Sequence, residues 1–541
     1  MATTRIDSLV QQAQRSRWLN TRLRWPRLWR FLALIPAGLV LLPLVYLLVR
    51  FLEPGLPGLA LLFRPATLLT VGRTSALSLA VTAASVAVAL PIAWLTVRTD
   101  LPGKSVWSIL AALPMVIPSY VAAYLMIAFL GPRGMLAQWL SGWTGIERLP
   151  SIYGFPGAFL ILTLLCYPYV LLGARAALQG MDPALEEAGR SLGYAPWQIF
   201  IKVVLPQLRP AVAAGGMLTA LYVLRDFGAV SLMRFDTITR VLYIQYKSAF
   251  DRTSASGLAL LLVGLTLLLV FIEGRTRSRA RYQRNATGSA RRPAVVRLGR
   301  WRWLALAFCG LVVALALFLP VGVLFYWLVR GIQAGERLAP LWVAVQNSLL
   351  ASFLAAFFTL AAALPVALAS VRRPGAWSSF CERVTYSGYA LPGIVVALAL
   401  VFLSANYAFP LYQSLALLVL AYVILFLPQA VGAVRASLLQ VHGSLEEAAQ
   451  SLGSTPWQSL RRVTLPLVRP GLLAGSALVF LTTMKELPAT LILSPLGFKT
   501  LATGVWSAVS EAYFAQAAAP ALLLVILSAI PMAILTIIEQ R

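Results

Sequence analysis

Pairs of adjacent charged residues interrupt the long apolar runs of this chain. Arg225-Asp226 and Lys485-Glu486 are mixed pairs that lie 260 positions apart. Ionisable groups inside a membrane span are unfavourable to bury, so these pairs indicate a substrate pathway. The structural alternative is that each pair is a neutralised bridge or lies in interfacial water. Two acidic pairs, Glu186-Glu187 and Glu446-Glu447, are also 260 positions apart and are suited to bind basic groups of a partner protein.

The acidic pairs belong to a longer internal repeat. Residues 185–215 read LEEAGRSLGYAPWQIFIKVVLPQLRPAVAAG and residues 445–475 read LEEAAQSLGSTPWQSLRRVTLPLVRPGLLAG, with 17 of 31 positions identical. We call them the first and the second elbow, because each is predicted to form two short helices joined by a tight bend. Both are polar segments in an otherwise apolar chain, so we expect them to face water.

Local capping signals define the bends. In the second elbow, the spacings of Ser444 to Glu447 and of Thr455 to Gln458 predict two capping boxes. Gly453 suits the left-handed residue that ends a helix, and the second short helix is predicted to stop at Pro466. In the first elbow, Asp182-Pro183 is predicted to open the first helix and Gly193 to form the bend. There Ala195-Pro196 is a weaker cap than Thr455-Pro456.

Composition identifies an integral membrane protein. The chain has 541 residues, of which 60% are hydrophobic, and a mean hydropathy of +0.80. Its formal net charge is +27, and 17 of its 45 basic residues lie in 1–30 and 275–302. Both basic segments flank predicted spans, as expected for positively charged cytoplasmic segments. Membrane topology therefore accounts for the charge, and we expect lipid but no nucleic acid as a partner.

The remaining side chains offer no metal centre. Cys166, Cys309 and Cys381 are far apart in sequence and His442 is the single histidine, so neither a disulfide framework nor a metal cluster is predicted.

Twelve apolar segments predict an all-α architecture of two six-helix halves. A basic arm (1–30) precedes the first half (31–272), and a basic linker (273–302) separates it from the second half (303–541). The predicted spans are 31–50, 75–97, 105–130, 156–178, 210–233, 256–272, 303–329, 347–371, 384–403, 411–433, 470–493 and 517–538.

The position of the elbows predicts a parallel duplication. Each elbow falls between the fourth and fifth spans of its half, and six spans separate the two, so both face the same side. The repeat extends to Val97-Arg98 and Val371-Arg372, and we match Leu113-Pro114 with Leu391-Pro392. The Arg-rich segments lie on the elbow side, which we expect to be the cytoplasm, with both termini there too.

The elbows resemble a known family. The pattern Glu187-Ala188-Gly189, Gly193, Val203, Leu205-Pro206, repeated as Glu447-Ala448-Ala449, Gly453, Val463, Leu465-Pro466, is similar to the coupling-helix signature of permease subunits of binding-protein-dependent ABC importers. Gly189 stands where that signature usually has Ala, and Val replaces Ile in both copies.

The resemblance implies that each elbow docks on an ATPase subunit. The expected partners are two ATPase subunits, a homodimer, and a periplasmic or lipoprotein substrate-binding protein. The residues implied in coupling are Glu186, Glu187, Ala188, Gly193, Trp197, Leu205, Pro206, Glu446, Glu447, Ala448, Gly453, Trp457, Leu465 and Pro466.

ATP hydrolysis is expected on a separate polypeptide. Gly103-Lys104-Ser105 looks like the end of a phosphate-binding loop, but the earlier glycine of that motif would fall at Arg98. We therefore expect this chain to be a transport subunit and not an enzyme, with no cofactor of its own and with ATP and magnesium on its partners.

The segment 485–502, KELPATLILSPLGFKTLA, looks like the corresponding stretch of ferric-iron permeases, which are often fused single chains. Ferric iron favours oxygen ligands, which Tyr222, Asp226 and Glu486 can offer, with Arg225 and Lys485 beside them on the predicted pathway. Thiamine, phosphonate and polyamine remain alternative cargoes. An ion-coupled secondary transporter is the alternative from another class. The resemblance implies a bacterial cytoplasmic membrane.

Overall fold

A computed structural model describes residues 28–53, 60, 62–145, 147–249, 252–279, 295–336 and 339–539. Most of the predicted basic arm (1–27 of 1–30) and half of the basic linker (280–294 of 273–302) lie outside the described residues. Within the described part the chain is helical, with an isolated parallel β-bridge between Thr99 and Val296.

The first half contains α2 (Leu28–Leu52), α4 (Pro65–Arg98), α5 (Lys104–Leu110), η1 (Leu113–Val116), α6 (Ser119–Leu130), α7 (Met135–Thr144), α8 (Phe155–Gln179), α9 (Pro183–Ser191), α10 (Pro196–Ile199), η2 (Phe200–Val204), α11 (Leu205–Arg225), α12 (Gly228–Leu232), α13 (Ile238–Ile244), η3 (Gln245–Ala249) and α14 (Arg252–Arg279).

The second half contains η4 (Gly299–Trp301), α15 (Arg302–Val313), η5 (Ala314–Phe318), α16 (Leu319–Gln333), α17 (Ala339–Arg372), α18 (Ala376–Ser387), η6 (Gly388–Ala390), α19 (Gly393–Tyr407), η7 (Phe409–Leu411), α20 (Leu415–Gln440), α21 (Gly443–Ser451), α22 (Pro456–Ser459), η8 (Leu460–Thr464), α23 (Leu465–Met484), α24 (Pro488–Leu493), α25 (Leu501–Ser510) and α26 (Phe514–Glu539).

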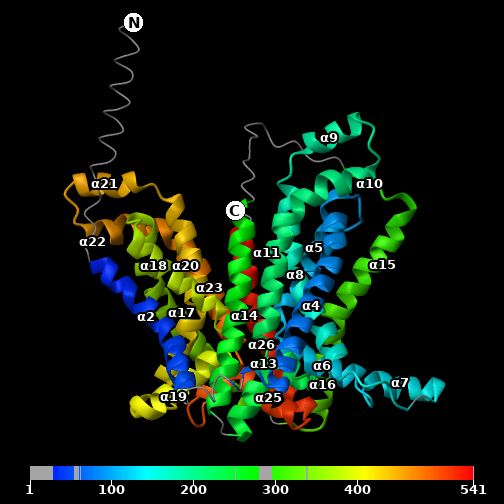
Figure 1. The fold of residues 1–541 in the computed structure, drawn as a ribbon. Helices are drawn as coiled ribbons and strands as arrows, with labels where there is room; N and C mark the ends of the chain where they lie inside the picture. The colour runs from blue at the N-terminus through cyan, green and yellow to red at the C-terminus, as the bar shows by residue number, and fades with distance from the viewer. Residues whose placement is uncertain are drawn as a thin grey trace.

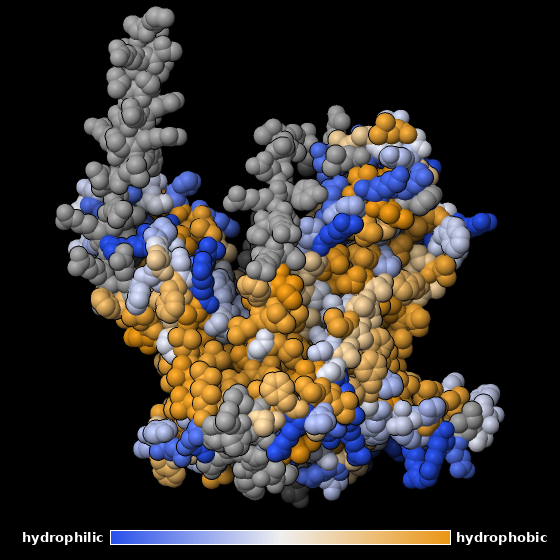
Figure 2. Space-filling model, in the orientation of Figure 1, coloured by the Kyte–Doolittle hydropathy of each residue, from blue (hydrophilic) through white to orange (hydrophobic). Residues whose placement is uncertain are grey.

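The predicted all-α membrane architecture is confirmed. Over the described ranges, nine helices are long and apolar enough to cross a membrane, and a pair bent by 106° at its break makes ten. The predicted segments 210–233 and 517–538 correspond to α11 with α12 and to α26, which are not among these ten. Figure 2 shows the apolar side chains as a broad belt with hydrophilic residues above and below it. This distribution is the one that a bilayer requires.

Both elbows lie on one face of the molecule, as α9 with α10 and α21 with α22 (Figure 1). The duplication is therefore parallel, as predicted. We call this side the elbow face. Arg98 precedes Arg372 by 274 positions, whereas Glu186 precedes Glu446 by 260, so the first half has 14 additional residues between these points. That interval includes α7, which projects sideways at the opposite face (Figure 1).

The third span of each half is broken, not continuous as predicted. Pro118 is the N-cap of α6 and Pro392 is the N-cap of α19, both with extended backbone. These prolines are 274 positions apart, the same interval as Arg98 to Arg372. The match of Pro114 with Pro392 is therefore wrong, and Pro118 is the equivalent residue. Proline lacks the N–H that a continuous helix needs and disfavours a helical conformation in the preceding residue, which explains both breaks.

The first helix of each half contacts the other half as well as its own. α2 packs against α17 and α18 of the second half, and α16 packs against α6 of the first half. The helices before and after each elbow, by contrast, pack within their own half: α8 with α4 and α11, and α20 with α17 and α23. The two halves are thus interlocked at the periphery, and each elbow is supported by a bundle of its own.

Candidate functional site

The bends of the elbows form as predicted. Gly193 has φ +80° and Gly453 has φ +90°, the left-handed conformation in which glycine avoids a steric penalty. Asp182 caps α9 by accepting from the N–H of Ala184 at 3.0 Å. Thr455 and Gln458 form the predicted capping box of α22.

Two local predictions in the second elbow are wrong. His442, not Ser444, is the N-cap of α21, so the capping box of Ser444 and Glu447 does not form. The helix after the bend does not stop at Pro466 either. α22 continues through the π-helical turn η8 into α23, and Pro466 lies in the first turn of α23. A π-helical turn shifts the hydrogen-bond register, so the missing proline N–H does not end the helix.

The first elbow is built in the same way. α10 continues through the π-helical turn η2 into α11, which begins at Leu205-Pro206. In both halves the second arm of the elbow is therefore the start of the fifth span. One continuous helix therefore joins the first elbow to the interior of the protein.

The first glutamate of each acidic pair is internal. Glu186 lies 2.9 Å from Arg98 at the end of α4, and both side chains are buried. Glu446 is fully buried and accepts from Nε of Arg372 at 3.0 Å and from the Thr464 hydroxyl at 2.8 Å. The prediction that Glu186 and Glu446 pair with a partner protein is therefore wrong. Each instead ties its elbow to the second span of its own half.

The outer surface of each elbow is formed by other residues. Glu187, Ala188 and Ala448 are exposed, and Glu447 is half-buried. Trp457 is 62% exposed, while the side chain of Trp197 lies outside the described residues. Sequence reasoning missed one apolar pair, Leu192 and Leu452, which are 74% and 88% exposed at the two bends. Their common spacing of 260 positions was the available signal.

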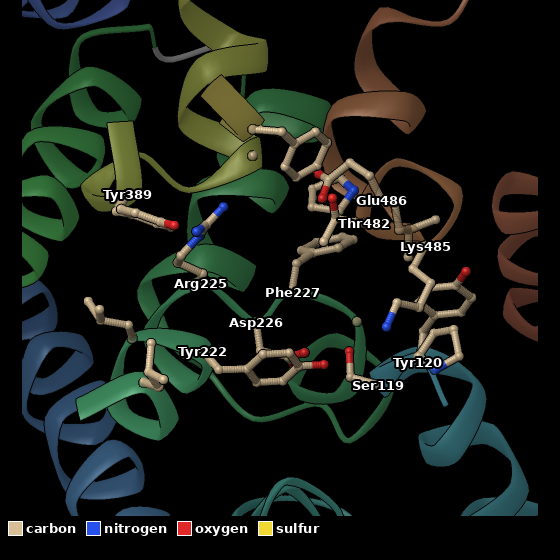
Figure 3. A pocket seen from close by; sticks show the side chains of 18 of the residues that line it. Ser119, Tyr120, Tyr222, Arg225, Asp226, Phe227, Tyr389, Thr482, Lys485 and Glu486 are labelled. Atoms are coloured by element: carbon tan, nitrogen blue, oxygen red, sulfur yellow. The ribbon is translucent and has the colours of Figure 1, made fainter. Parts of the chain in front are cut away.

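The predicted pathway residues converge on one cavity of about 290 Å³ between the halves (Figure 3). Its lining includes all five of them, Tyr222, Arg225, Asp226, Lys485 and Glu486. The mixed pairs lie where the fifth spans break, since α11 ends at Arg225 and α23 ends at Met484. α11 has 21 residues, so at 1.5 Å per residue this break is roughly 30 Å from the first elbow. The predicted position near the end of the span opposite the elbow is thus confirmed.

The two carboxylates of the cavity cap short helices. Oδ1 of Asp226 accepts from the N–H groups of Ala229 and Val230 at 3.0 and 3.3 Å, at the start of α12. Oε1 of Glu486 accepts from the N–H of Ala489 at 3.2 Å, at the start of α24. A carboxylate is stabilised at a helix N-terminus by these N–H donors and by the helix dipole. Both acids therefore have a structural role, which holds them at fixed positions on the cavity wall.

The two cations reach across the boundary between the halves. Nζ of Lys485 donates to the carbonyl of Met115 in η1 at 3.2 Å. Arg225 lies beside Tyr389 of η6 on the cavity wall (Figure 3). Arg225 and Lys485 are 260 positions apart, and Met115 and Tyr389 are 274 apart, so the two arrangements are related by the internal repeat.

Sequence reasoning missed most of the cavity's tyrosines. Tyr120, Tyr169 and Tyr389 line it together with Tyr222. The rings of Tyr169 and Tyr222 are 5.7 Å apart, and the buried hydroxyl of Tyr120 has no hydrogen-bond partner among the described residues. These residues come from four different helical segments and share no sequence motif. Within the described part of the chain no three His, Cys, Asp or Glu side chains gather at one point. The oxygen atoms that line the cavity include the carboxylates of Asp226 and Glu486 and the hydroxyl groups of these tyrosines.

Comparison with known proteins identifies the family. Residues 85–282 and 359–541 match the binding-protein-dependent transport system inner membrane component. The chain belongs to this family. Its two matched segments each contain one elbow and one mixed pair, so the permease contains the family's membrane component twice.

Three relatives show what this permease is similar to. The Fe(3+)-transport system permease protein FbpB 2 of Haemophilus influenzae is 35% identical over 517 residues, which cover 95% of this chain and 98% of the relative. The molybdenum transport system permease protein ModB of Escherichia coli is 30% identical over 206 residues, covering 36% of this chain and 89% of the relative. The sulfate transport system permease protein CysW of Escherichia coli is 28% identical over 246 residues, covering 44% and 83%.

Membership defines the general role of the protein. It is a multi-pass membrane permease subunit of an ABC importer and is not itself an enzyme. The family works with a substrate-binding protein and with an ATPase, so this permease has partners of both kinds.

Proposed function

We propose that the permease moves ferric iron into the cytoplasm. The similarity to an Fe(3+)-transport permease over 98% of that relative's length carries this assignment, because the molybdenum and sulfate relatives match only part of the chain. A binding protein outside the membrane delivers the iron. Two identical ATPase subunits on the cytoplasmic side bind ATP and magnesium, and each binds one of the two elbows. The elbow face and both termini then lie in the cytoplasm of a bacterial cell.

The surfaces of the elbows support coupling to an ATPase. Exposed apolar side chains at a bend, Leu192 in one half and Leu452 and Trp457 in the other, are unfavourable in water and are typical of protein interfaces. Glu187 and Glu447 add negative charge beside them. Since each elbow continues into the fifth span, closure of the ATPase pair would move α11 and α23 and with them the cavity.

The cavity supports passage of a hard cation. Asp226, Glu486 and the surrounding tyrosine hydroxyls are oxygen donors, which ferric iron prefers. Arg225 and Lys485 keep the charge of the cavity balanced, so the ion is held weakly enough to move on. The contact of Lys485 with Met115 joins the halves at this level and has to break when they separate.

Reconstituted transport tests the proposal. The permease is placed in proteoliposomes with its ATPase and binding protein, and uptake of radioactive ferric iron is measured with ATP, without ATP and with an imposed ion gradient. We expect uptake that requires ATP and that molybdate and sulfate do not compete away. Uptake of molybdate or sulfate in place of iron would overturn the cargo, and uptake driven by the gradient alone would support a secondary transporter.

A further inference from the structure

A second cavity, also of about 290 Å³, lies in the first half between α4, α5 and α8, at their elbow ends. It is lined by Thr96, Val97, Lys104, Ser105, Ser108, Arg175 and Gln179. Six of these seven side chains are polar, two are cationic and none is acidic. This cavity has no part in the pathway or in the elbow surfaces described above.

The internal repeat shows what is unusual here. Arg175 on α8 is equivalent to Arg435 on α20, at the interval of 260 positions. Nε of Arg435 lies 3.0 Å from Oε1 of Glu382 on α18. The position equivalent to Glu382, at the interval of 274, is Ser108 on α5. Arg175 reaches this same position, because its Nη1 donates to the carbonyl of Ser108 at 3.4 Å. The arginine is thus present in both halves, but the carboxylate is present in one.

The first half also adds a cation. Lys104 occupies the position equivalent to Ser378, whose hydroxyl donates to the carbonyl of Arg373. Among the described residues neither Lys104 nor Arg175 forms an ion pair. The Nε atom of Arg175 is buried without a hydrogen-bond partner in this part of the chain. The acid nearest to Lys104 in sequence, Asp100, accepts instead from the N–H of Leu298.

Two uncompensated cations at the edge of an apolar bundle favour the binding of an anion. A guanidinium group binds phosphate oxygens through paired N–H donors, and an ammonium group adds a point charge. The Ser105 hydroxyl and the Gln179 amide provide further donors on the same wall. We propose that this cavity binds a phosphate group, which takes the place that the carboxylate of Glu382 occupies in the second half.

The surroundings of the cavity leave two sources for this phosphate. Val106 and Ile109 on α5 are 58% and 59% exposed beside it, so the cavity lies next to lipid. Basic pockets between membrane helices near the cytoplasmic surface bind the headgroups of anionic lipids. Free phosphate has the same chemistry and reaches the same face from water.

Two probes separate these sources. The full-length protein is purified in detergent, retention of added phosphatidylglycerol or phosphatidylcholine is measured by native mass spectrometry, and binding of radioactive inorganic phosphate is measured by equilibrium dialysis. The variants are K104Q with R175Q, and S108E, which installs the carboxylate of the second half. The matched control is R435Q, which removes the equivalent arginine. Thermal unfolding checks each variant.

We expect the wild type and R435Q to bind one of the two phosphate probes saturably, and both test variants to bind it at least tenfold more weakly. If the protein retains phosphatidylglycerol but does not bind inorganic phosphate in dialysis, the ligand is a lipid headgroup. If it binds inorganic phosphate but does not retain phosphatidylglycerol, the ligand is free phosphate. S108E still tests the proposal if the double variant does not fold. Its carboxylate would pair with Arg175, as Glu382 pairs with Arg435 in the second half, so the cavity keeps its arginine but no longer needs a phosphate. The absence of saturable binding to wild type, equal binding in S108E, or an equal loss in R435Q would overturn the proposal.

Discussion

Arg372 donates from its Nε atom to Oε1 of Glu446 at 3.0 Å, and this carboxylate is fully buried. The arginine ends α17 and the glutamate lies in the second elbow, so the contact joins the second span of the half to the segment that follows the fourth. Arg98 and Glu186 make the equivalent contact in the first half. A glutamate beside the coupling signature thus fixes the elbow to the membrane bundle and leaves its neighbour on the outer surface.

Replacing Glu446 with Gln should destabilise the protein and uncouple it. The change leaves Arg372 buried without its counter-charge, and loss of one partner of a buried pair costs about 3–5 kcal/mol. We expect a lower thermal unfolding temperature and, in reconstituted complexes, at least tenfold less transport per ATP hydrolysed. The double variant R372E/E446R should recover part of both losses. E511Q, at an exposed acid near α25, serves as the control, and an unchanged E446Q would contradict the role of this pair.

Replacing Glu187 and Glu447 with Ala should weaken the complex with the ATPase and leave the permease stable. Their carboxylates lie toward the outer surface, and a hydrogen bond to a charged group contributes about 1.5–3 kcal/mol. We expect at least tenfold weaker association in co-purification, together with reduced transport. E186A gives the opposite pattern, with a larger loss of stability than of association. If the Glu187 and Glu447 variant associates with the ATPase as strongly as the wild type, these residues are not part of the interface.

Replacing Asp226 with Asn and Glu486 with Gln should slow iron transport without releasing the ATPase. The amide oxygens can still accept from the N–H groups that start α12 and α24, so the caps remain while the negative charges are lost. We expect the initial rate of ferric iron uptake to fall at least tenfold. Normal uptake by the double variant would reduce both acids to structural caps. D236N, an acid outside the cavity, controls for general effects of charge.

Replacing Gly215 with Ala should separate α11 from α8. A Cβ atom at this position would lie 2.6 Å from Cα of Val170, a backbone atom that a side-chain rotation cannot move away. Overpacking of this kind costs about 1–3 kcal/mol. Thermal unfolding of the purified protein should therefore shift to lower temperature. The same substitution at Gly72, where no atom lies within 4 Å, should have little effect, and equal behaviour of the two variants would contradict the close packing.

Sequence patterns predicted the all-α membrane architecture, the common face of the two elbows and the place of the mixed pairs. Long apolar segments predict spans because a bilayer sets their length, and six spans between the elbows place both on one face. The bends at Gly193 and Gly453 and the box of Thr455 with Gln458 were predictable because they depend on residues a few positions apart. The mixed pairs could be placed near the far end of the fifth span from the rise of a helix alone.

The tertiary structure decided what each of these residues contacts. Glu186 and Glu187 are neighbours with identical chemistry, and only the position of Arg98 makes one internal and leaves the other at the surface. The tyrosines of the central cavity come from separate segments, so no local pattern marks them. The match of Pro118, and not Pro114, with Pro392 became clear only when both prolines were seen as the N-caps of α6 and α19. Contacts between distant segments depend on side-chain direction and packing, which spacing along the chain does not specify.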